Sequence, residues 1–153
     1  MISDLILAFQ HTLQSGLFVD EIMHGVVTLP FVALLYYKTK SVKDSLIPLV
    51  VTYMIDMDHW VDYVLFYGWD ISLAKFVAGD YFDLTGRAVV PLHAWEWLFI
   101  VSLLARKKGK WKSVYTSLAF GVLAHLLWDS YTVGSVVFYS IIFRIINGFI
   151  IMV

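Results

Sequence analysis

Residues 45–67 read SLIPLVVTYMIDMDHWVDYVLFY, an apolar run that is interrupted by four ionisable side chains. A helix needs roughly 20 residues to cross the hydrocarbon core of a bilayer, and this run is long enough to do so. Its ionisable side chains are Asp56, Asp58, His59 and Asp62. Because a charged group within a spanning helix is costly, these residues predict a functional site in a membrane helix.

The composition of the whole chain also favours a membrane protein. Its 153 residues are 60% hydrophobic and 15% charged, whereas soluble domains are roughly 45–50% apolar and about 25% charged. A small soluble domain needs more polar surface than a large one, not less. We therefore exclude a soluble domain, a disordered segment and a nucleic-acid-binding module. The chain has no cysteine, which excludes disulfides and thiolate metal sites.

Five stretches are long and apolar enough to be spanning helices, and the runs are too long for barrel strands. They cover residues 17–38, 45–67, 89–105, 113–130 and 133–153. In residues 1–16 the apolar positions follow one helix face, which is typical of an amphipathic helix lying in the interface. The predicted fold class is all-α: a polytopic transmembrane helical bundle over residues 17–153, preceded by this interfacial helix. Residues 1–153 are expected to form a single integral membrane domain.

Basic residues predict the orientation of the bundle, because they are enriched in cytoplasmic loops. Two of the predicted loops hold eight of them: Lys38, Lys40 and Lys43 in one, and Arg106, Lys107, Lys108, Lys110 and Lys112 in the other. The long loop 68–88 holds only Lys75 and Arg87. We therefore expect a multi-pass protein of the cell membrane, with the N-terminus and loop 68–88 outside and the C-terminus in the cytoplasm.

Four of the predicted helices carry a histidine together with a carboxylate. The side chains are Asp20, Glu21 and His24; Asp56, Asp58, His59 and Asp62; His93 and Glu96; and His125 and Asp129. Within each helix, pairs of them are three or four residues apart, so they share one face. With the predicted orientation, all four groups fall in the outer half of the bundle. We expect them to converge on one site.

Histidine combined with aspartate or glutamate suits Zn²⁺, Mn²⁺ or Fe²⁺, whereas Mg²⁺ and Ca²⁺ favour oxygen ligands alone. The candidates suffice for one or two divalent ions, and two ions can hold a phosphoryl group and activate water. Interhelical hydrogen bonding is the alternative explanation for any single residue. Asp20, Glu21 and Asp62 fit an interfacial or supporting role equally well. For Arg144 three roles stay open: pairing with a buried carboxylate, binding a lipid headgroup, or approaching a substrate phosphate.

The order of these motifs resembles the membrane-bound metal-dependent hydrolases of the YdjM-like family. The matching elements are His24-Gly25, Asp56-Met-Asp58-His59, a central His93, and His125-x-x-x-Asp129 followed by Gly134. The likeness covers roughly residues 20–140 and implies an integral membrane protein with a bound divalent metal and hydrolase activity. Two departures stand out. Ile55 replaces a usual proline, and the family's usual pair of central histidines is reduced to His93, with Glu96 in the next turn.

We therefore expect a membrane-embedded hydrolase that binds one or two divalent ions, zinc or manganese, on its outer side. The expected metal ligands are His24, Asp56, Asp58, His59, His93, His125 and Asp129. The expected catalytic residues are Asp56, as bridging ligand or general base, and Glu96, as ligand or proton shuttle. The expected partners are the lipid bilayer and a lipid-derived or phosphoester substrate, near Arg87 or Lys75. A transporter or channel for metal ions or protons is the alternative, and a haem-binding bundle is a third possibility that the carboxylates disfavour.

Overall fold

The computed structural model describes residues 16–151, and it describes side chains from Val19 onward. This part of the chain is all-helical, as predicted, and its one β-type pairing is an isolated bridge between Arg87 and Ile150. The predicted interfacial helix over residues 1–16 lies outside the described residues, except for its last residue.

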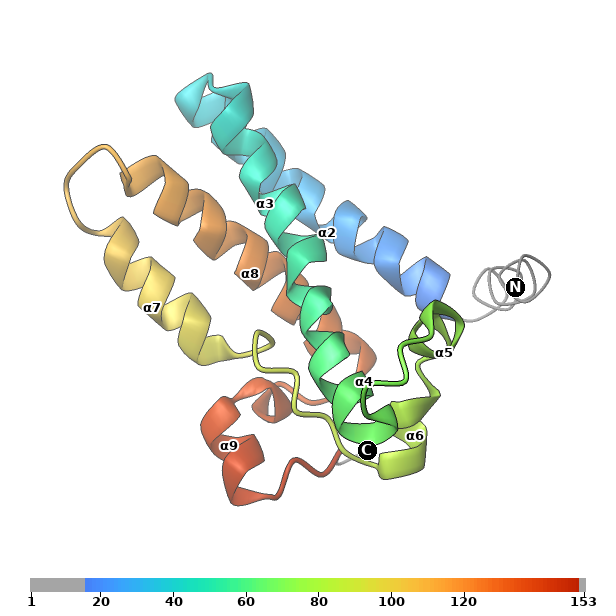
Figure 1. Cartoon of the computed structure of the whole chain (residues 1–153). Coiled ribbons are helices and arrows are strands. Elements are labelled where there is room, and N and C mark those ends of the chain that lie inside the picture. Colours follow the sequence, from blue (N-terminus) through green and yellow to red (C-terminus); the bar gives the residue numbers. More distant parts are fainter. Residues whose placement is uncertain (1–15, 152–153) are drawn as a thin grey trace.

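Two long helical segments form the first hairpin of the bundle (Figure 1). α2 covers Gly16–Thr39, and α3 covers Val42–Ile55. α3 continues through a 3-10 turn, η1 (Asp56–Asp58), into α4 (His59–Tyr67). These elements confirm the helices predicted at 17–38 and 45–67. The 3-10 turn falls on the acidic motif of the second helix, so the site begins where the regular helix is interrupted.

A second hairpin consists of α7 (Trp95–Ala105) and α8 (Lys112–Thr132), joined by the basic loop. α8 lies at the centre, because it packs against α2, α3 and α7. Gly121 allows the close approach of α8 to α3. A Cβ atom at this position would lie 2.7 Å from Val51 Cβ and 2.9 Å from the Pro48 carbonyl oxygen.

The helix predicted at 89–105 begins only at Trp95, so the prediction is wrong for its first six residues. Pro91 lacks a backbone N–H and disfavours the helical conformation of the residue before it. Val90 adopts a φ of +29°, which is also outside the helical region. The backbone N–H groups of residues 89, 90 and 92 donate instead to the carboxylates of Asp58 and Asp62. Buried carboxylates thus replace the hydrogen bonds of a helix.

The spanning helix predicted at 133–153 is also wrong within the described residues. The segment forms only η2 (Val137–Tyr139) and α9 (Ile141–Ile146), and it turns at Gly134 and Gly148 with φ values of +73° and +64°. It then runs back beside the segment that follows α6. The hydrogen bond from the Ala88 N–H to the Phe149 carbonyl, at 3.0 Å, joins the two segments. The segment therefore ends on the same side of the bundle as loop 68–88, not on the opposite side as predicted.

Loop 68–88 itself contains two short helices, α5 (Leu73–Ala78) and α6 (Asp80–Thr85). In Figure 1 they lie at the same end of the bundle as α4, α9 and the start of α2. The basic turns between α2 and α3 and between α7 and α8 lie away from this end. The two ends of the bundle therefore differ in both structure and charge.

Among the described residues, a single helical stretch, Val19–Thr39, has both the length and the apolar composition of a membrane span. Core helices of soluble proteins and signal sequences meet the same criterion. α3, α4 and α7 are individually too short, at 14, 9 and 11 residues. Five uninterrupted spanning helices are therefore not what the structure shows.

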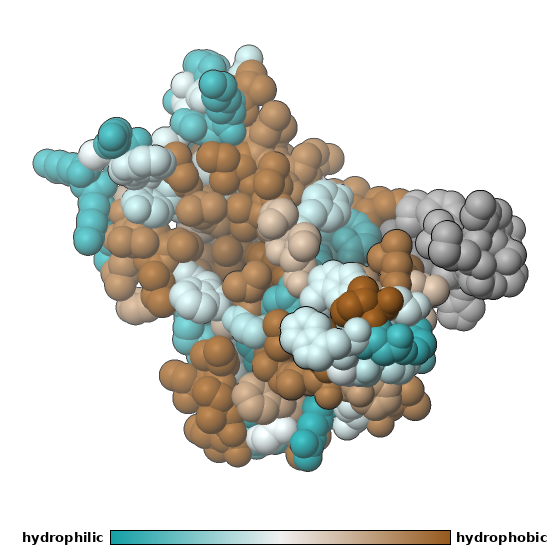
Figure 2. Space-filling model, viewed as in Figure 1, coloured by the Kyte–Doolittle hydropathy of each residue, from teal (hydrophilic) through white to brown (hydrophobic). Residues whose placement is uncertain are grey.

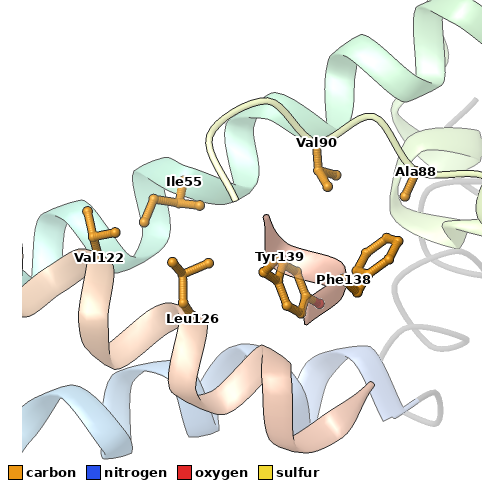
Figure 3. Packing of buried hydrophobic residues seen from close by; sticks show 7 residues of the cluster. All are labelled: Ile55, Ala88, Val90, Val122, Leu126, Phe138 and Tyr139. Atoms are coloured by element: carbon orange, nitrogen blue, oxygen red, sulfur yellow. The ribbon is translucent and has the colours of Figure 1, made fainter. Parts of the chain in front are cut away.

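A small apolar core joins the two hairpins to the C-terminal segment (Figure 3). Ile55 of α3 faces Val122 and Leu126 of α8, and Phe138 and Tyr139 of η2 lie on the other side of Leu126. Residues 86–94, between α6 and α7, form no helix, and we call them the irregular segment before α7. Ala88 and Val90 of this segment close the core. The core thus packs directly beside the residues of the predicted site.

Candidate metal centre

Six of the predicted ligands converge at the end of the bundle that carries α5 and α6. We call them the His/Asp cluster: His24 from α2, Asp56 from η1, His59 from α4, His93 from the irregular segment, and His125 and Asp129 from α8. His24, His93, His125 and Asp129 are all buried. The convergence predicted from helix spacing and depth is therefore present in the structure.

Asp129 is contacted by three imidazoles. Its Oδ1 lies 2.6 Å from Nε2 of His24, which joins α8 to α2. Its Oδ2 lies 3.1 Å from Nε2 of His125 and 3.5 Å from Nε2 of His93. One carboxylate thus faces the Nε2 atoms of histidines from three separate segments.

Asp56 faces the same group of histidines through its Oδ1 atom. This atom lies 3.3 Å from Nε2 of His93, 3.6 Å from Nε2 of His125 and 3.7 Å from Nε2 of His59. Two donors that are each about 2.1 Å from a shared ion are separated by ~3.0–3.4 Å at ordinary coordination angles. The spacings around Asp56, and those from Asp129 to His125 and His93, are close to this range, whereas the 2.6 Å between Asp129 and His24 is the length of a direct hydrogen bond.

Two of the histidines are oriented through their second ring nitrogen. Nδ1 of His93 lies 3.0 Å from Oδ1 of Asp58, and Nδ1 of His24 lies 3.1 Å from the carbonyl oxygen of Asp20. A carbonyl can only accept, so Nδ1 of His24 carries the hydrogen and its Nε2 faces the Asp129 carboxylate. Such contacts to the outer nitrogen are typical of metal-ligating histidines. At 2.6 Å, Nε2 and the carboxylate oxygen are at the distance of a direct hydrogen bond, which requires a proton between these two acceptors.

Several buried nitrogen and oxygen atoms of the cluster have no hydrogen-bond partner, and they show whether a divalent ion would fit there. Oδ2 of Asp56, Oδ2 of Asp129 and both ring nitrogens of His125 make no hydrogen bond within the described part of the chain. Leaving buried polar atoms unpaired is costly. The cluster also contains three overlapping triplets whose ligand atoms lie within 4.8 Å of one another: His24, Asp56 and His125; Asp56, His59 and His93; and His93, His125 and Asp129. This set of nitrogen and oxygen donors fits a divalent transition metal.

Asp58 and Asp62 support the cluster from outside. Besides facing His93, Asp58 accepts a hydrogen bond from the Leu92 N–H at 2.5 Å. Asp58 belongs to none of the triplets and faces the outer nitrogen of His93, which is an orienting position; its assignment as a metal ligand stays a prediction. Asp62 accepts from the N–H groups of Val89 and Val90, which is the supporting role considered for it.

Glu96 lies apart from the cluster. Its carboxylate accepts from the Ser140 hydroxyl at 2.6 Å and from the Ile141 N–H at 3.1 Å. Both oxygens are thereby engaged at the start of α9, and Glu96 is not among the residues that line the cavity described below. The structure therefore places it at a helix start, not at the predicted catalytic position.

Arg144 takes none of the three positions that the sequence left open. It is buried and donates to the carbonyl oxygens of Val89, Val90 and His93, at 2.7, 2.9 and 2.7 Å. It thus holds the carbonyl groups of this segment, whereas Asp58 and Asp62 hold its N–H groups. No pattern in the sequence predicted this role, because the segment was expected to be helical.

Five of the six cluster residues form the floor of a cavity of about 700 Å³, and the sixth, His125, is fully buried behind it. Its walls are largely apolar and come from α5, α6, the segment before α7 and η2, with Phe76, Phe82, Val90 and Phe138 among them. Lys75 and Arg87, which we expected near a phosphate, do not line it, and Lys75 pairs with Asp70 at 2.6 Å.

The cavity lining includes two tyrosines that no pattern in the sequence predicted as functional residues. Tyr81 of α6 and Tyr139 of η2 both line the cavity, and both are buried. Burial raises the pKa of both phenols, so each stays a neutral hydroxyl. The ring of Tyr139 also stacks beside His93, with centroids 6.1 Å apart. The cavity thus offers neutral hydroxyl groups next to the cluster.

Comparison of the chain with protein-family models, curated proteins and solved structures gave no significant match. The resemblance to the YdjM-like hydrolases therefore stays a prediction from the motifs.

Proposed function

We propose that the protein is a membrane-embedded, metal-dependent hydrolase. The single observation that carries this proposal is the His/Asp cluster, with its unpartnered buried donor atoms, at the floor of a largely apolar cavity. Buried groups of this kind next to a cavity are typical of functional sites. The motif resemblance to the YdjM-like family supports the same activity.

The distribution of apolar residues supports a multi-pass membrane arrangement. Leu29 of α2, Val50 of α3 and Phe99 of α7 are more than half exposed, while charged side chains are buried in the cluster. Figure 2 shows hydrophobic residues over much of the visible surface, with hydrophilic ones at the tips of the two hairpins and in further patches at the end that carries α5 and α6. Large exposed apolar surfaces mark membrane or protein contacts.

We propose four membrane-embedded segments in place of the five predicted: α2, α3 with α4, α7, and α8. α7 has 11 residues, which cover about 16 Å at the helical rise of 1.5 Å per residue. The irregular segment before α7 therefore completes its crossing, which is possible because it is buried in protein. The basic turns would face the cytoplasm, and the cluster would lie near the opposite leaflet.

Within the cluster, the six histidine and aspartate side chains would hold one or two divalent ions, and Asp58 would orient His93. A bound divalent ion would polarise a phosphoryl or ester oxygen and lower the pKa of water. Asp56, with one oxygen unpartnered, is positioned to accept a proton from that water. In hydrolysis of a phosphoester, the water oxygen bonds to phosphorus, the bond to the alcohol oxygen breaks, and the alcohol leaves with a proton.

A transporter or channel needs a polar path that continues beyond the cluster. The buried hydroxyls of Thr28, Ser45 and Ser117 lie in the helices, but each donates to a carbonyl three or four residues earlier in its own chain. These bonds are local and do not link one helix to the next. We therefore favour the hydrolase.

Hydrolysis of phosphodiester and carboxylic ester lipids by detergent-purified protein tests the proposal. We expect turnover that chelation abolishes and that Zn²⁺ or Mn²⁺ restores. Asp56→Asn and His93→Gln are expected to lower kcat at least 100-fold, whereas Asp70→Asn, at an exposed position away from the cavity, leaves it unchanged. Absence of turnover with every lipid, or unchanged kcat in both cluster variants, would overturn the proposal.

A further inference from the structure

The charge of the cavity lining limits what the proposed hydrolase can bind. Within the described part of the chain, five carboxylates line the cavity, those of Asp20, Glu21, Asp56, Asp83 and Asp129, and no lysine or arginine does. The lining therefore keeps a net negative charge even if two divalent ions are bound. A phosphomonoester, with its two negative charges, is poorly matched to such a site.

Four of the carboxylates divide into two groups by position, and the fifth, Asp20, accepts a hydrogen bond from the Trp128 indole N–H. Asp56 and Asp129 belong to the cluster on the floor. Glu21 and Asp83 are exposed and belong to α2 and α6, so they form an acidic rim from two elements. Asp129 is more than nine-tenths buried, lines the cavity and has an unpartnered oxygen. The rim thus opens into the same cavity as Asp129, whose Oδ2 faces the imidazoles of His125 and His93.

The walls between floor and rim are apolar. Phe76, Phe82 and Phe138 line this part, and they come from α5, α6 and η2. Aromatic walls of this kind bury the apolar part of a ligand. A ligand that matches the whole cavity has three parts: an anionic group for the floor, a cationic group for the rim and an apolar chain for the walls.

Resting on the proposed function, we propose that the substrate is a zwitterionic phosphodiester lipid, with an ammonium headgroup. Its single phosphate charge faces the metal cluster, its ammonium group lies at Glu21 and Asp83, and an acyl chain lies along the phenylalanines. The acidic rim then disfavours phosphodiester lipids with an uncharged or anionic headgroup, because these lack a cation to offset it.

Hydrolysis and binding of two lipids with identical acyl chains test the inference: phosphatidylethanolamine and phosphatidylglycerol in mixed micelles. We expect kcat/KM to be at least tenfold higher for phosphatidylethanolamine. Glu21→Gln and Asp83→Asn are expected to raise KM for this lipid about three- to tenfold without raising it for phosphatidylglycerol. Asp80→Asn is the matched control, because Asp80 lies on α6 but does not line the cavity.

Native mass spectrometry of lipid binding distinguishes a failure of the proposed hydrolase activity from a failure of the proposed headgroup preference. Hydrolysis without a headgroup preference would overturn the inference and leave the proposed function intact. Preferential binding of phosphatidylethanolamine without turnover would overturn the hydrolase and keep the inference about the ligand. Equal binding of both lipids, or equal effects of Glu21→Gln and Asp80→Asn, would overturn the inference.

Discussion

Nε2 of His24 lies 2.6 Å from Oδ1 of Asp129, a contact that joins the first long helix to the last across 105 residues of sequence. The Nδ1 atom of the same ring faces the carbonyl oxygen of Asp20. Both nitrogens of a buried imidazole thus face oxygen acceptors. A proton between His24 and Asp129 satisfies this arrangement at 2.6 Å. A metal ion bound to Nε2 of His24 would displace that proton and would also satisfy the unpartnered Oδ2 of Asp56 and Nε2 of His125.

Replacement of Asp58 tests the orientation of His93. Asp58→Asn keeps the shape of the side chain but removes the charge that faces Nδ1 of His93. Loss of such an orienting partner typically lowers metal affinity about 10- to 100-fold. We expect this decrease, with unchanged metal stoichiometry at saturation, in a competition titration against a chelator. Affinity equal to that of the native protein would show that Asp58 does not orient the ring for a metal.

Arg144→Leu tests whether the Arg144 side chain stabilises the irregular segment before α7. The change removes three hydrogen bonds from a charged donor to backbone carbonyls. Leaving buried acceptors without a partner costs about 1–3 kcal/mol for each group. We expect a correspondingly lower free energy of unfolding in mild detergent, with partial recovery in Arg144→Lys. A loss below about 0.5 kcal/mol would contradict the role assigned to Arg144.

Glu96→Gln separates a structural role from a catalytic one. The carboxylate accepts hydrogen bonds from Ser140 and from backbone N–H groups at the start of α9. Loss of its charge weakens these bonds, and we expect a destabilisation of about 1–2 kcal/mol. Metal affinity and kcat are expected to stay within twofold of the native values. A drop in kcat without loss of stability would restore Glu96 to the catalytic role predicted from the sequence.

Gly121→Ala tests the close packing of α8 on α3. The added Cβ would lie 2.7 Å from Val51 Cβ, and overpacking of a buried contact costs about 1–3 kcal/mol. The unfolding midpoint in detergent is expected to fall accordingly. Leu127→Ala, on the same helix but 46% exposed, serves as the control and should change stability by less than about 0.5 kcal/mol. Equal effects of the two variants would show that the helices can separate without cost.

The sequence predicted the convergence of the cluster because helix spacing and depth can be read from residue types alone. His125 and Asp129 share a face of α8 as expected, with 3.1 Å between Nε2 and Oδ2. The prediction was wrong where it assumed a helix that does not form. His93 and Glu96 are three residues apart, but Ala94 between them is extended, with φ of −142° and ψ of 131°. The two side chains therefore do not share a helix face.

The C-terminal segment shows a second limit of sequence reasoning. Residues 133–153 are apolar enough to suggest a spanning helix, but long-range hydrogen bonds favour another structure over the described part. Arg144 bonds to carbonyls more than 50 residues away, and the Ile151 N–H donates to the Gly86 carbonyl. Hydropathy reports only whether a segment can enter lipid, and it carries no information about such partners.

The metal content of detergent-purified protein tests the central claim most directly. We predict one or two equivalents of a divalent transition metal per chain, measured by elemental analysis after exhaustive desalting. The ratio is expected to fall below ~0.2 in Asp129→Asn and His125→Gln, because each removes a donor from the cluster, and to stay unchanged in Asp70→Asn. Native protein that is folded, monodisperse and free of stoichiometric metal, and that takes up none on titration with Zn²⁺ or Mn²⁺, would contradict the account.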